Sequence, residues 1–369
     1  MVPCNKGGDS EAVAMKVHVG YCVSEESKNP FRDLFVRAIK DHPAVSEVTT
    51  GTNSVLDSPS RNTDILHLHW PEALTDWTNP SSSGLEAVSR HLDAWRETAH
   101  VVTTVHNRHP HSGDTNEYRN LYRIVYERTD GFVHFGDASR HILAADHPSA
   151  SRNADHVIIP HGRYTCFEQD VERLEARRKL GYGEHEFVVL TFGALREPEE
   201  LDLVVRGFVR CRVRKKRLLI ASRVSWPSRK RLTYYRIRGR LLADWRIRVK
   251  DEFIPDDEVA YFLRAADVLV IPRLNALNSG NVALGFTFGT VVVGPKIGVI
   301  GETLANTGNP TYSAGDAVGL GEALNEAQQA RERKVRRKNE SFARSNWNWK
   351  TIAEQHVSFY RQLIQSGAG

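Results

Sequence analysis

The sequence contains no long hydrophobic run. A membrane-spanning helix needs about 20 consecutive apolar residues, but the longest apolar stretch, at 268–271, has only the length of a strand. Residues 1–14 are polar and contain glycine, so they lack the apolar core of a secretory signal. We expect them to form a flexible N-terminal segment. We also expect a cytoplasmic protein, either free or peripheral at the inner face of the membrane.

Cysteine is also scarce. The chain of 369 residues has four cysteines, which lie far apart and form no CxxC pair. This spacing disfavours a zinc site and predicts free thiols in a reducing compartment. The four are Cys4, Cys22, Cys166 and Cys211.

Acidic residues are nearly absent from two stretches. Between 206 and 250, Asp244 is the only acid, and this basic segment holds much of the excess behind the net charge of +5. Three interpretations are open: a solvated surface, attraction to an anionic membrane or a lipid phosphate, and nucleic acid. The lack of a recognition motif argues against nucleic acid as a partner. The second stretch, 268–301, has no acid at all and would not repel a diphosphate.

Apolar strands alternate with amphipathic helices in two series, which predicts an α/β fold with two doubly wound parallel sheets. A charged helix at 168–179 separates the two series. We expect Rossmann-like domains over 15–170 and 171–340, with ligands between them at the carboxyl ends of the strands. The expected strands are 15–22, 64–69, 100–106, 131–135, 156–160, 186–193, 217–221, 246–253, 267–271 and 290–294. The expected helices are 30–40, 83–97, 118–128, 201–210, 256–266, 281–288, 316–330 and 349–364.

Histidines follow two of the expected strands. His67 and His69 lie on one face of the second strand, where they either pair on a metal or, as we favour, belong to a loop that shapes the cleft. His106 lies at the tip of the third strand, where an imidazole can bond a substrate hydroxyl or transfer a proton near neutral pH. Capping of the strand, or a metal site with His109 and His111, are the alternatives for His106.

Two glycine-containing turns predict an anion site in the second domain. Gly193 ends a strand and lets the backbone approach a ligand closely, and Arg196 can hold a phosphate through two parallel hydrogen bonds. Asn278, Ser279 and Gly280 precede an apolar helix whose N-terminal amides attract anions. An ordinary capped helix start is the alternative for this second turn.

Several motifs, taken in order, resemble those of GT-B glycosyltransferases related to the family 4 group. These include bacterial transferases that build exopolysaccharide or glycolipid. The resemblance covers about Lys16 to Tyr360, and it rests on the order and spacing of the motifs rather than on any one of them. The motifs are NPF at 29–31, DILHLHWPE from 64, TVHNRHPH from 104, VIIPHGRY from 157, FGALR from 192, FIPDDEVAYFLRAADVLVIPR from 253 and LNSGNVALGFTFGTVVVGPKIGVIGE from 277.

The resemblance implies a GT-B fold in which a helix within 341–369 crosses back onto the N-terminal domain. It implies a hexosyltransferase for surface polysaccharide or glycolipid synthesis, with a UDP- or GDP-linked sugar as donor and a saccharide or lipid-linked acceptor. His106 is the expected catalytic residue. The expected acceptor-side residues are His69, Asn107 and His161. The expected donor-binding residues are Gly193, Arg196, Arg223, Phe253, Ile254, Asn278, Ser279, Gly280 and Glu302.

The sequence departs from this family just after Arg196, where relatives often carry a lysine. Three acids, Glu197, Glu199 and Glu200, occupy this stretch instead. They motivate an alternative function, a catalytically silent GT-B-like protein that binds a nucleotide-sugar or a partner transferase. Lys296 or Arg223 would have to offset their charge. No acidic pair marks a metal–diphosphate site, so we expect metal-independent transfer and no cofactor.

Overall fold

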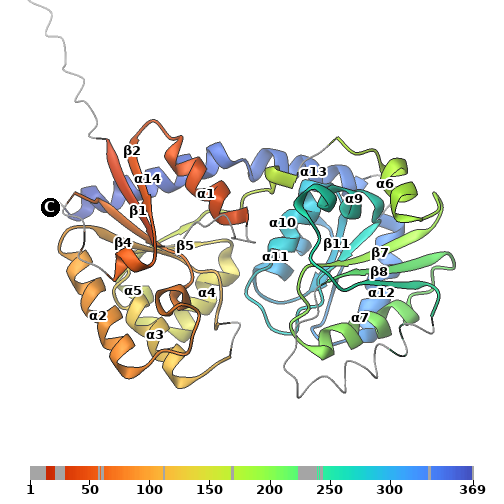
Figure 1. Cartoon of the computed structure of the whole chain (residues 1–369), viewed down its shortest axis with the longest axis horizontal. Helices are drawn as coiled ribbons and strands as arrows, with labels where there is room; N and C mark the ends of the chain where they lie inside the picture. The colour runs from red at the N-terminus through yellow and green to blue at the C-terminus, as the bar shows by residue number, and fades with distance from the viewer. Residues whose placement is uncertain are drawn as a thin grey trace, which may run out of the picture.

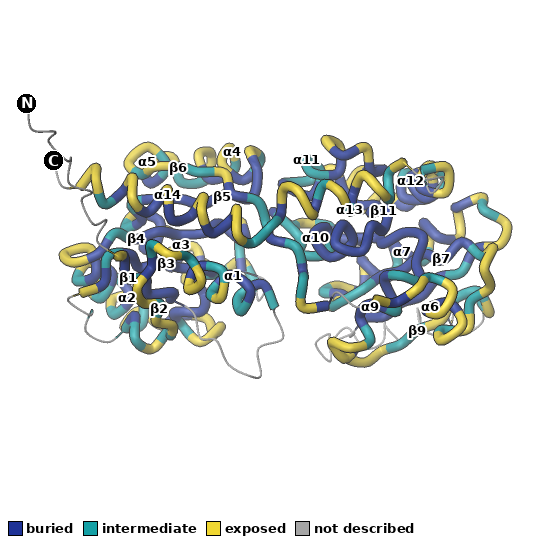
Figure 2. The backbone as a smooth tube through the Cα atoms, turned by 90° about the horizontal axis from the view of Figure 1, so that it is seen from above, coloured by how far each residue is buried: buried dark blue, intermediate teal, exposed yellow. Residues whose placement is uncertain are grey.

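The chain forms two α/β domains that lie side by side, with its last helices running along one side of both (Figure 1). Buried residues follow the sheets through the centre of each domain, and exposed residues lie on the outer helices and loops (Figure 2). The computed structural model describes residues 14–20, 30–56, 59, 62–110, 113–167, 170–222, 239, 241, 244–330 and 334–367.

The N-terminal domain is built on a six-stranded parallel sheet. Its strands are β1 (Met15–Gly20), β2 (Val45–Thr50), β3 (Ile65–Leu68), β4 (His100–Thr104), β5 (Gly131–His134) and β6 (Asp155–Ile158). They lie in the order β2-β1-β3-β4-β5-β6, so the direction of winding reverses between β1 and β3. Ligands of open parallel sheets bind at such a reversal.

Helices surround this sheet, and polar side chains define where two of them begin. Ser81 accepts a hydrogen bond from the Gly84 amide, and Thr115 accepts one from the Tyr118 amide, which satisfies amides that have no partner within the helix. The helices are α1 (Pro30–Lys40), α2 (Ser82–Arg96), α3 (Asn116–Tyr126), α4 (Asp137–Asp146) and α5 (Pro148–Arg152), with 3-10 turns η1 (Asn53–Val55) and η2 (Pro71–Thr75).

The C-terminal domain has a second six-stranded parallel sheet. Its strands are β7 (Phe187–Phe192), β8 (Lys216–Ala221), β9 (Ile247–Lys250), β10 (Val268–Val270), β11 (Val291–Pro295) and β12 (Thr311–Tyr312). The order β12-β11-β10-β7-β8-β9 reverses between β7 and β10. This is the strand order of the dinucleotide-binding fold.

The helices of this half are joined to the sheet partly through a buried ion pair. Arg177 lies in α6 and donates to Asp267 Oδ2 at 2.7 Å, and the Val188 amide of β7 donates to the same oxygen at 2.8 Å. The helices are η3 (Thr165–Phe167), α6 (Arg173–Leu180), α7 (Pro198–Arg210), α9 (Asp256–Ala265), α10 (Gly280–Thr287), α11 (Gly298–Thr307), α12 (Ala317–Ala330), α13 (Lys334–Asn346) and α14 (Trp349–Gly367). Among the described helices, none combines the length and apolar character needed to cross a bilayer.

The predicted fold class, two doubly wound parallel sheets, is confirmed, and the differences lie in the elements with weak patterns. The sequence analysis did not predict β2, because this edge strand is mostly exposed and its polar residues do not alternate with apolar ones. It also did not predict α4, α11 and α13. Helix α7 begins at Pro198, three residues before the prediction, because proline is favoured in the first turn. The predicted segment 1–14 lies almost entirely outside the described residues, as do Cys4 and Cys22, whereas Cys166 and Cys211 are free thiols.

Helix α14 returns to the N-terminal domain and packs against α1. It brings His356 and Tyr360 into the core behind β3, where the Tyr360 hydroxyl lies 2.5 Å from His67 Nδ1. His67 Nε2 in turn lies 2.7 Å from Thr104 Oγ1. Burial lowers the pKa of His356 to about 4 and that of His69 to about 3, and it lowers the pKa of His67 well below its usual value. These histidines are therefore neutral in the folded protein.

A carboxylate of the C-terminal domain caps a helix of the N-terminal domain. Glu302 of α11 accepts hydrogen bonds from the amides of Asp137 and Ala138, at 3.1 and 2.8 Å. These amides open α4, and the positive end of a helix favours a carboxylate. The contact fixes the two domains relative to each other on the side opposite α1.

The buried histidines predict that stability falls below neutral pH. The unfolded chain binds protons on these groups below about pH 6.5, whereas the folded chain holds them neutral down to about pH 4 for His356. The folded state therefore loses up to about 1.4 kcal/mol per histidine per pH unit in this window. We expect a lower melting temperature at about pH 5.5 than at about pH 7, and a smaller difference for His356→Leu. The exposed His141→Leu is the control, and an unchanged difference in His356→Leu would contradict the assignment.

The capping contact predicts that Glu302→Ala loosens the domain interface. The variant loses two hydrogen bonds to a carboxylate, each of which contributes up to about 1.5–3 kcal/mol. We expect a larger radius of gyration in small-angle X-ray scattering and faster proteolysis between the domains, with each domain still folded. Glu322→Ala, at an exposed position of α12, should behave as the wild type. Identical scattering from the wild type and Glu302→Ala would show that this cap does not hold the domains.

Candidate functional site

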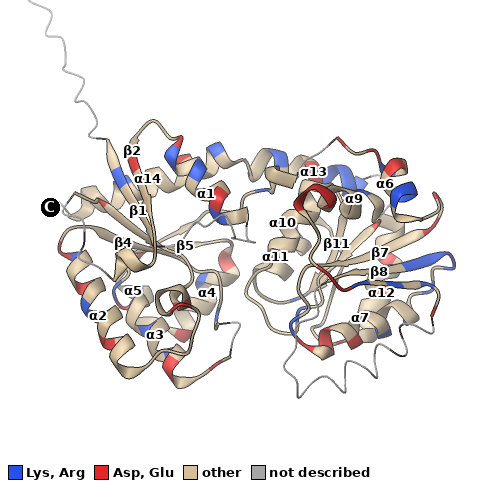
Figure 3. Ribbon diagram, viewed as in Figure 1, with Lys and Arg blue, Asp and Glu red and all other residues tan. Residues whose placement is uncertain are grey.

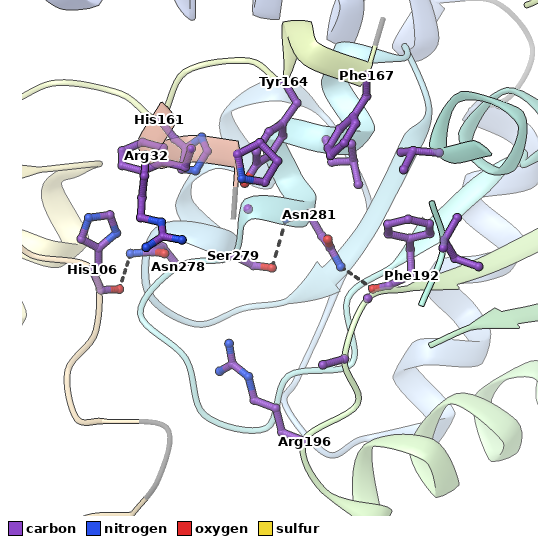
Figure 4. A pocket seen from close by; sticks show the side chains of 18 of the residues that line it. Arg32, His106, His161, Tyr164, Phe167, Phe192, Arg196, Asn278, Ser279 and Asn281 are labelled. Carbon is purple, nitrogen blue, oxygen red and sulfur yellow. Dashed lines mark hydrogen bonds between the residues drawn. The ribbon is translucent and has the colours of Figure 1, made fainter. Parts of the chain in front are cut away.

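A cleft of about 670 Å³ lies between the two domains. Its walls come from the carboxyl ends of strands in both sheets, at the two positions where the strand order reverses. Figure 4 shows that Arg196 points into this space from one side and that His106 and Arg32 line it from another. The cleft therefore has one wall from each domain.

The end of β7 forms part of the C-terminal wall. Gly193 has a φ of +84°, a conformation that favours glycine, and it turns the chain away from the sheet. Asn281 Nδ2 donates to the Phe192 carbonyl at 2.8 Å and ties this turn to α10. The turn carries Arg196, whose pKa is lowered to about 10 by burial and by the neighbouring Arg273. At neutral pH Arg196 is therefore a partly desolvated cation facing the cleft.

The N-terminus of α10 lies beside this cation. Ser279 is its capping residue and accepts from the Asn281 amide at 3.4 Å. A Cβ atom at Gly280 would lie 2.5 Å from Tyr164 Oη, so only glycine allows the helix to begin this close to Tyr164. Amides at a helix N-terminus attract anions. The cation and the helix terminus together make this wall suited to a diphosphate.

The acids that follow Arg196 do not face the cleft. Glu200 is buried. It accepts a hydrogen bond from Arg273 Nη1 at 2.8 Å and another from the Arg196 amide at 2.7 Å. Its charge is thus neutralised by Arg273, which is itself a lining residue. Glu197 and Glu199 are exposed at the start of α7 and do not line the cleft. The repulsion expected from this stretch is therefore largely removed by an arginine that the sequence analysis did not identify.

His106 is the central residue of the N-terminal wall. Its ring stacks on Trp70 with centroids 3.8 Å apart and planes at 21°. Its backbone carbonyl accepts from Asn278 Nδ2 at 2.5 Å, a bond that joins the two walls directly. Behind it, His106 Nε2 lies 2.9 Å from His69 Nδ1. The His106 ring is therefore positioned by Trp70 on one face and by His69 at Nε2.

His69 is buried and supports His106 from behind. Because burial lowers its pKa to about 3, His69 is neutral and shares one proton with His106 Nε2. Its Nε2 atom is buried without a hydrogen-bond partner among the described residues. A bare ring nitrogen is more readily left without a partner than an N–H group. The geometry therefore favours His69 as the donor to His106.

The far end of the cleft is lined by the segment after β9. Phe253, Ile254 and Asp256 line it, and Glu252 pairs with Lys250 at 3.2 Å. Half of the Phe253 side chain is exposed. This end offers apolar and acidic groups rather than cations.

Most of the predicted site residues line this one cleft, and among the described ones two do not. Glu302 lines a separate cavity of about 190 Å³ and caps α4, whereas His69 lies behind the cleft. Arg223 lies outside the described residues, as does His111. The predicted residues that line the cleft are His106, Asn107, His161, Gly193, Arg196, Phe253, Ile254, Asn278, Ser279 and Gly280.

Several lining residues were not predicted. They include Arg32, Trp70, Trp77, Tyr164 and Arg273. Trp70 belongs to the DILHLHWPE motif and Arg32 follows NPF, so the motifs marked their neighbourhoods without indicating their roles. Among the described residues, no group of three His, Cys, Asp or Glu is arranged to hold a metal ion.

The described part of the basic segment lies at the outer edge of the C-terminal domain, on β8 and β9 (Figure 3). Much of its charge is paired there. Arg217 binds Glu186 at 2.6 Å, and Arg246 binds Asp244 at 2.7 Å. Lys216 is buried. Among the described residues, the segment is thus more neutral than its composition indicates.

Comparison with known proteins points to glycosyltransferases. The chain is 28% identical over 249 residues to the D-inositol 3-phosphate glycosyltransferase of Corynebacterium efficiens. This match covers 64% of the chain and 55% of that protein, so the chain spans about half the length of this curated relative. No family model matches the chain.

Solved structures share the whole architecture at low identity. HepE of Anabaena, solved with UDP-glucose, superimposes with a TM-score of 0.70 over 94% of this chain and 100% of that one, at 12% identity. Sucrose-phosphate synthase of Thermosynechococcus elongatus gives a TM-score of 0.63 over 82% of this chain and 74% of that one, at 17% identity. The chain therefore has the two-domain GT-B fold of these glycosyltransferases, as the motifs predicted.

Proposed function

We propose that the protein transfers a hexose from a nucleotide-sugar to a saccharide or lipid-linked acceptor. The observation that carries this proposal is the shared cleft, in which Arg196 and the N-terminus of α10 face His106 from the opposite domain. This arrangement provides an anion site and a polar ring on either side of one space. The similarity to a curated glycosyltransferase supports the same reaction class.

In this proposal the donor diphosphate lies between Arg196 and the amides of α10. Negative charge grows on the diphosphate as the bond to the sugar breaks, and groups fixed in advance around it lower the barrier. Arg273 keeps Glu200 from opposing this effect. Transfer through these groups would not require a metal ion. The base of a UDP or GDP donor would lie along Phe253 and Ile254.

The acceptor would approach from the N-terminal wall. If His69 donates to His106 Nε2, then His106 carries its own proton on Nδ1 and acts as a hydrogen-bond donor. In that form His106 would hold an oxygen of the transferred sugar or of the acceptor rather than remove a proton. Asn107 and His161 line the same wall. Closure of the two walls would exclude water that otherwise hydrolyses the donor.

The cellular role we propose is the synthesis of surface polysaccharide or glycolipid. The protein would act in the cytoplasm and contact the inner face of the membrane through its basic segment. The alternative function, a silent protein that only binds a nucleotide-sugar, is less well supported, because Glu200 is paired and the other two acids lie outside the cleft. Donor hydrolysis measured across a panel of nucleotide-sugars distinguishes the two functions.

Arg196→Ala tests the donor site. Removing one fixed cation from a developing diphosphate lowers kcat by about 10²–10³-fold in comparable sites. We expect a loss of this order with the donor that the wild type turns over best. Arg344→Ala removes an exposed arginine that pairs with Glu340 on α13, and it should retain full activity. Equal turnover by Arg196→Ala and the wild type would rule out this donor site.

His69 is tested by two substitutions that differ in hydrogen bonding. Asparagine can place an N–H group close to the position of His69 Nδ1, whereas leucine cannot. We expect His69→Leu to lower kcat about 10-fold, corresponding to one hydrogen bond of about 1.4 kcal/mol, and His69→Asn to recover most of it. The KM for the donor should stay unchanged in both. If both variants lose the same activity, His69 acts through packing and not through its bond to His106.

A further inference from the structure

Three aromatic rings form a continuous surface along the N-terminal wall. His106 stacks on Trp70, and Trp70 in turn lies 6.3 Å from Trp77, centroid to centroid, with the planes at 47°. All three line the cleft. Because His106 covers one face of Trp70, the ring of Trp77 is the one that extends the surface beyond the proposed reaction centre.

The backbone that carries these tryptophans is strained. Trp70, Asp76 and Trp77 have φ angles of 36°, 50° and 60°, and they are the three non-glycine residues with positive φ among the described residues. A bulky side chain at positive φ is an outlier that persists only where the surroundings impose it. All three lie at or next to η2, so the strain is confined to the segment that presents the rings to the cleft.

Buried hydrogen bonds hold this segment in its strained form. The Trp77 amide donates to the Glu72 carbonyl at 2.9 Å, and the Tyr118 hydroxyl donates to the Trp77 carbonyl at 3.2 Å. The carboxylate of Glu72 is buried and accepts from the Tyr122 hydroxyl at 2.8 Å. Asn107, beside His106, donates to the same carboxylate at 3.4 Å. The position of Trp77 is thus fixed by the same network that holds the N-terminal wall.

The indole of Trp77 is only half buried. Trp77 is 49% exposed, whereas Trp95 is 1% and Trp347 is 5% exposed in the cores. Its neighbours Asp76, Thr78 and Asn79 are exposed and polar. A tryptophan that is both strained and half exposed at the edge of a cleft indicates a binding role.

We propose that Trp77 binds a pyranose ring of an oligosaccharide acceptor, one unit beyond the sugar that receives the transferred hexose. A pyranose has one face of C–H groups, which can lie on an indole, and a rim of hydroxyls, which the surrounding polar side chains can contact. The first unit then lies beside His106 and Trp70. This inference rests on the proposed function, and it narrows the acceptor to a saccharide of at least two units.

The surroundings of Trp77 favour a saccharide over an acyl chain. A lipid tail needs a surface that is apolar along its whole length. The surface of three rings includes the polar imidazole of His106, and it ends at Trp77, the one large exposed apolar side chain of a polar turn, Thr75 to Asn79. A flat ring rimmed by hydroxyl and amide groups matches a ligand that alternates apolar faces with hydroxyls.

The test compares Trp77→Ala with Trp245→Ala. Trp245 is 76% exposed, stacks on Arg217 and does not line the cleft, so its removal controls for the loss of an exposed indole. The full-length proteins are applied to a glycan array of mono-, di- and trisaccharides that includes alkyl glucosides. We expect the wild type and Trp245→Ala to bind at least one di- or trisaccharide more tightly than its constituent monosaccharide. In Trp77→Ala the ratio of these two affinities should fall by at least 10-fold.

A second measurement separates this inference from the proposed function. Donor hydrolysis by the wild type in the absence of acceptor reports on the proposed function alone, whereas the oligosaccharide preference that Trp77→Ala loses reports on the ring of Trp77. Trp77→Ala should remain folded at the temperature of the binding assay, as a melting curve would show, so that a loss of binding is not a loss of folding. Trp77→Phe should recover part of the binding.

Three results would overturn the proposed role of Trp77. The wild type could show no preference for any oligosaccharide, or Trp77→Ala could retain the preference. The preference that depends on Trp77 could also be for alkyl glucosides alone. Absence of donor hydrolysis in the wild type would instead count against the proposed function. In that case a Trp77-dependent preference for oligosaccharides would still support a saccharide-binding cleft.

Discussion

The return of α14 to the N-terminal domain is the contact on which the shape of the cleft depends. This helix, at the end of the C-terminal half, packs on α1 and places Tyr360 against His67. His67 stacks on His69 at 4.5 Å, and His69 supports the ring of His106. The N-terminal wall is therefore held from behind by a segment that follows the whole C-terminal domain in the sequence. The N-terminal domain would therefore not present its wall in the same way without this helix.

The two walls of the cleft differ in charge and in the kind of side chain that lines them. The C-terminal wall gathers positive charge in a partly buried space, and it does so by confining Glu200 to Arg273 and leaving Arg196 toward the cleft. The N-terminal wall is built largely from rings, with Arg32 as its cation. Burial keeps its histidines neutral, as the lowered pKa of His69, about 3, and of His161, about 4, indicates. These neutral rings can bind an uncharged ligand without competing for the anion.

The sequence predicted what depends on local pattern and failed where the determinant is distant. The β-branched run of β4 and the apolar run of β10 predicted buried parallel strands, and the turns at Gly193 and Ser279, predicted to form an anion site, lie in one cleft. The sequence could not reveal that Glu302 caps α4, because the partners are 164 and 165 residues apart. The pairing of Glu200 with Arg273 spans 73 residues and was missed for the same reason. Trp77 carries no sequence signal, since its importance lies in a backbone angle.

The chain passes between the domains twice, and the two passages lie side by side. The Arg163 amide donates to the Trp347 carbonyl at 3.1 Å, and Trp349 Nε1 donates to the Arg163 carbonyl at 2.7 Å. Two adjacent chain segments of this kind allow one domain to rotate relative to the other about the line of the segments, and they oppose sliding or twisting of the domains. Opening about this line would have to break the Glu302 cap of α4 and the bond from Asn278 to the His106 carbonyl. The crossing segments thus leave these two contacts as the ones that separate a closed cleft from an open one.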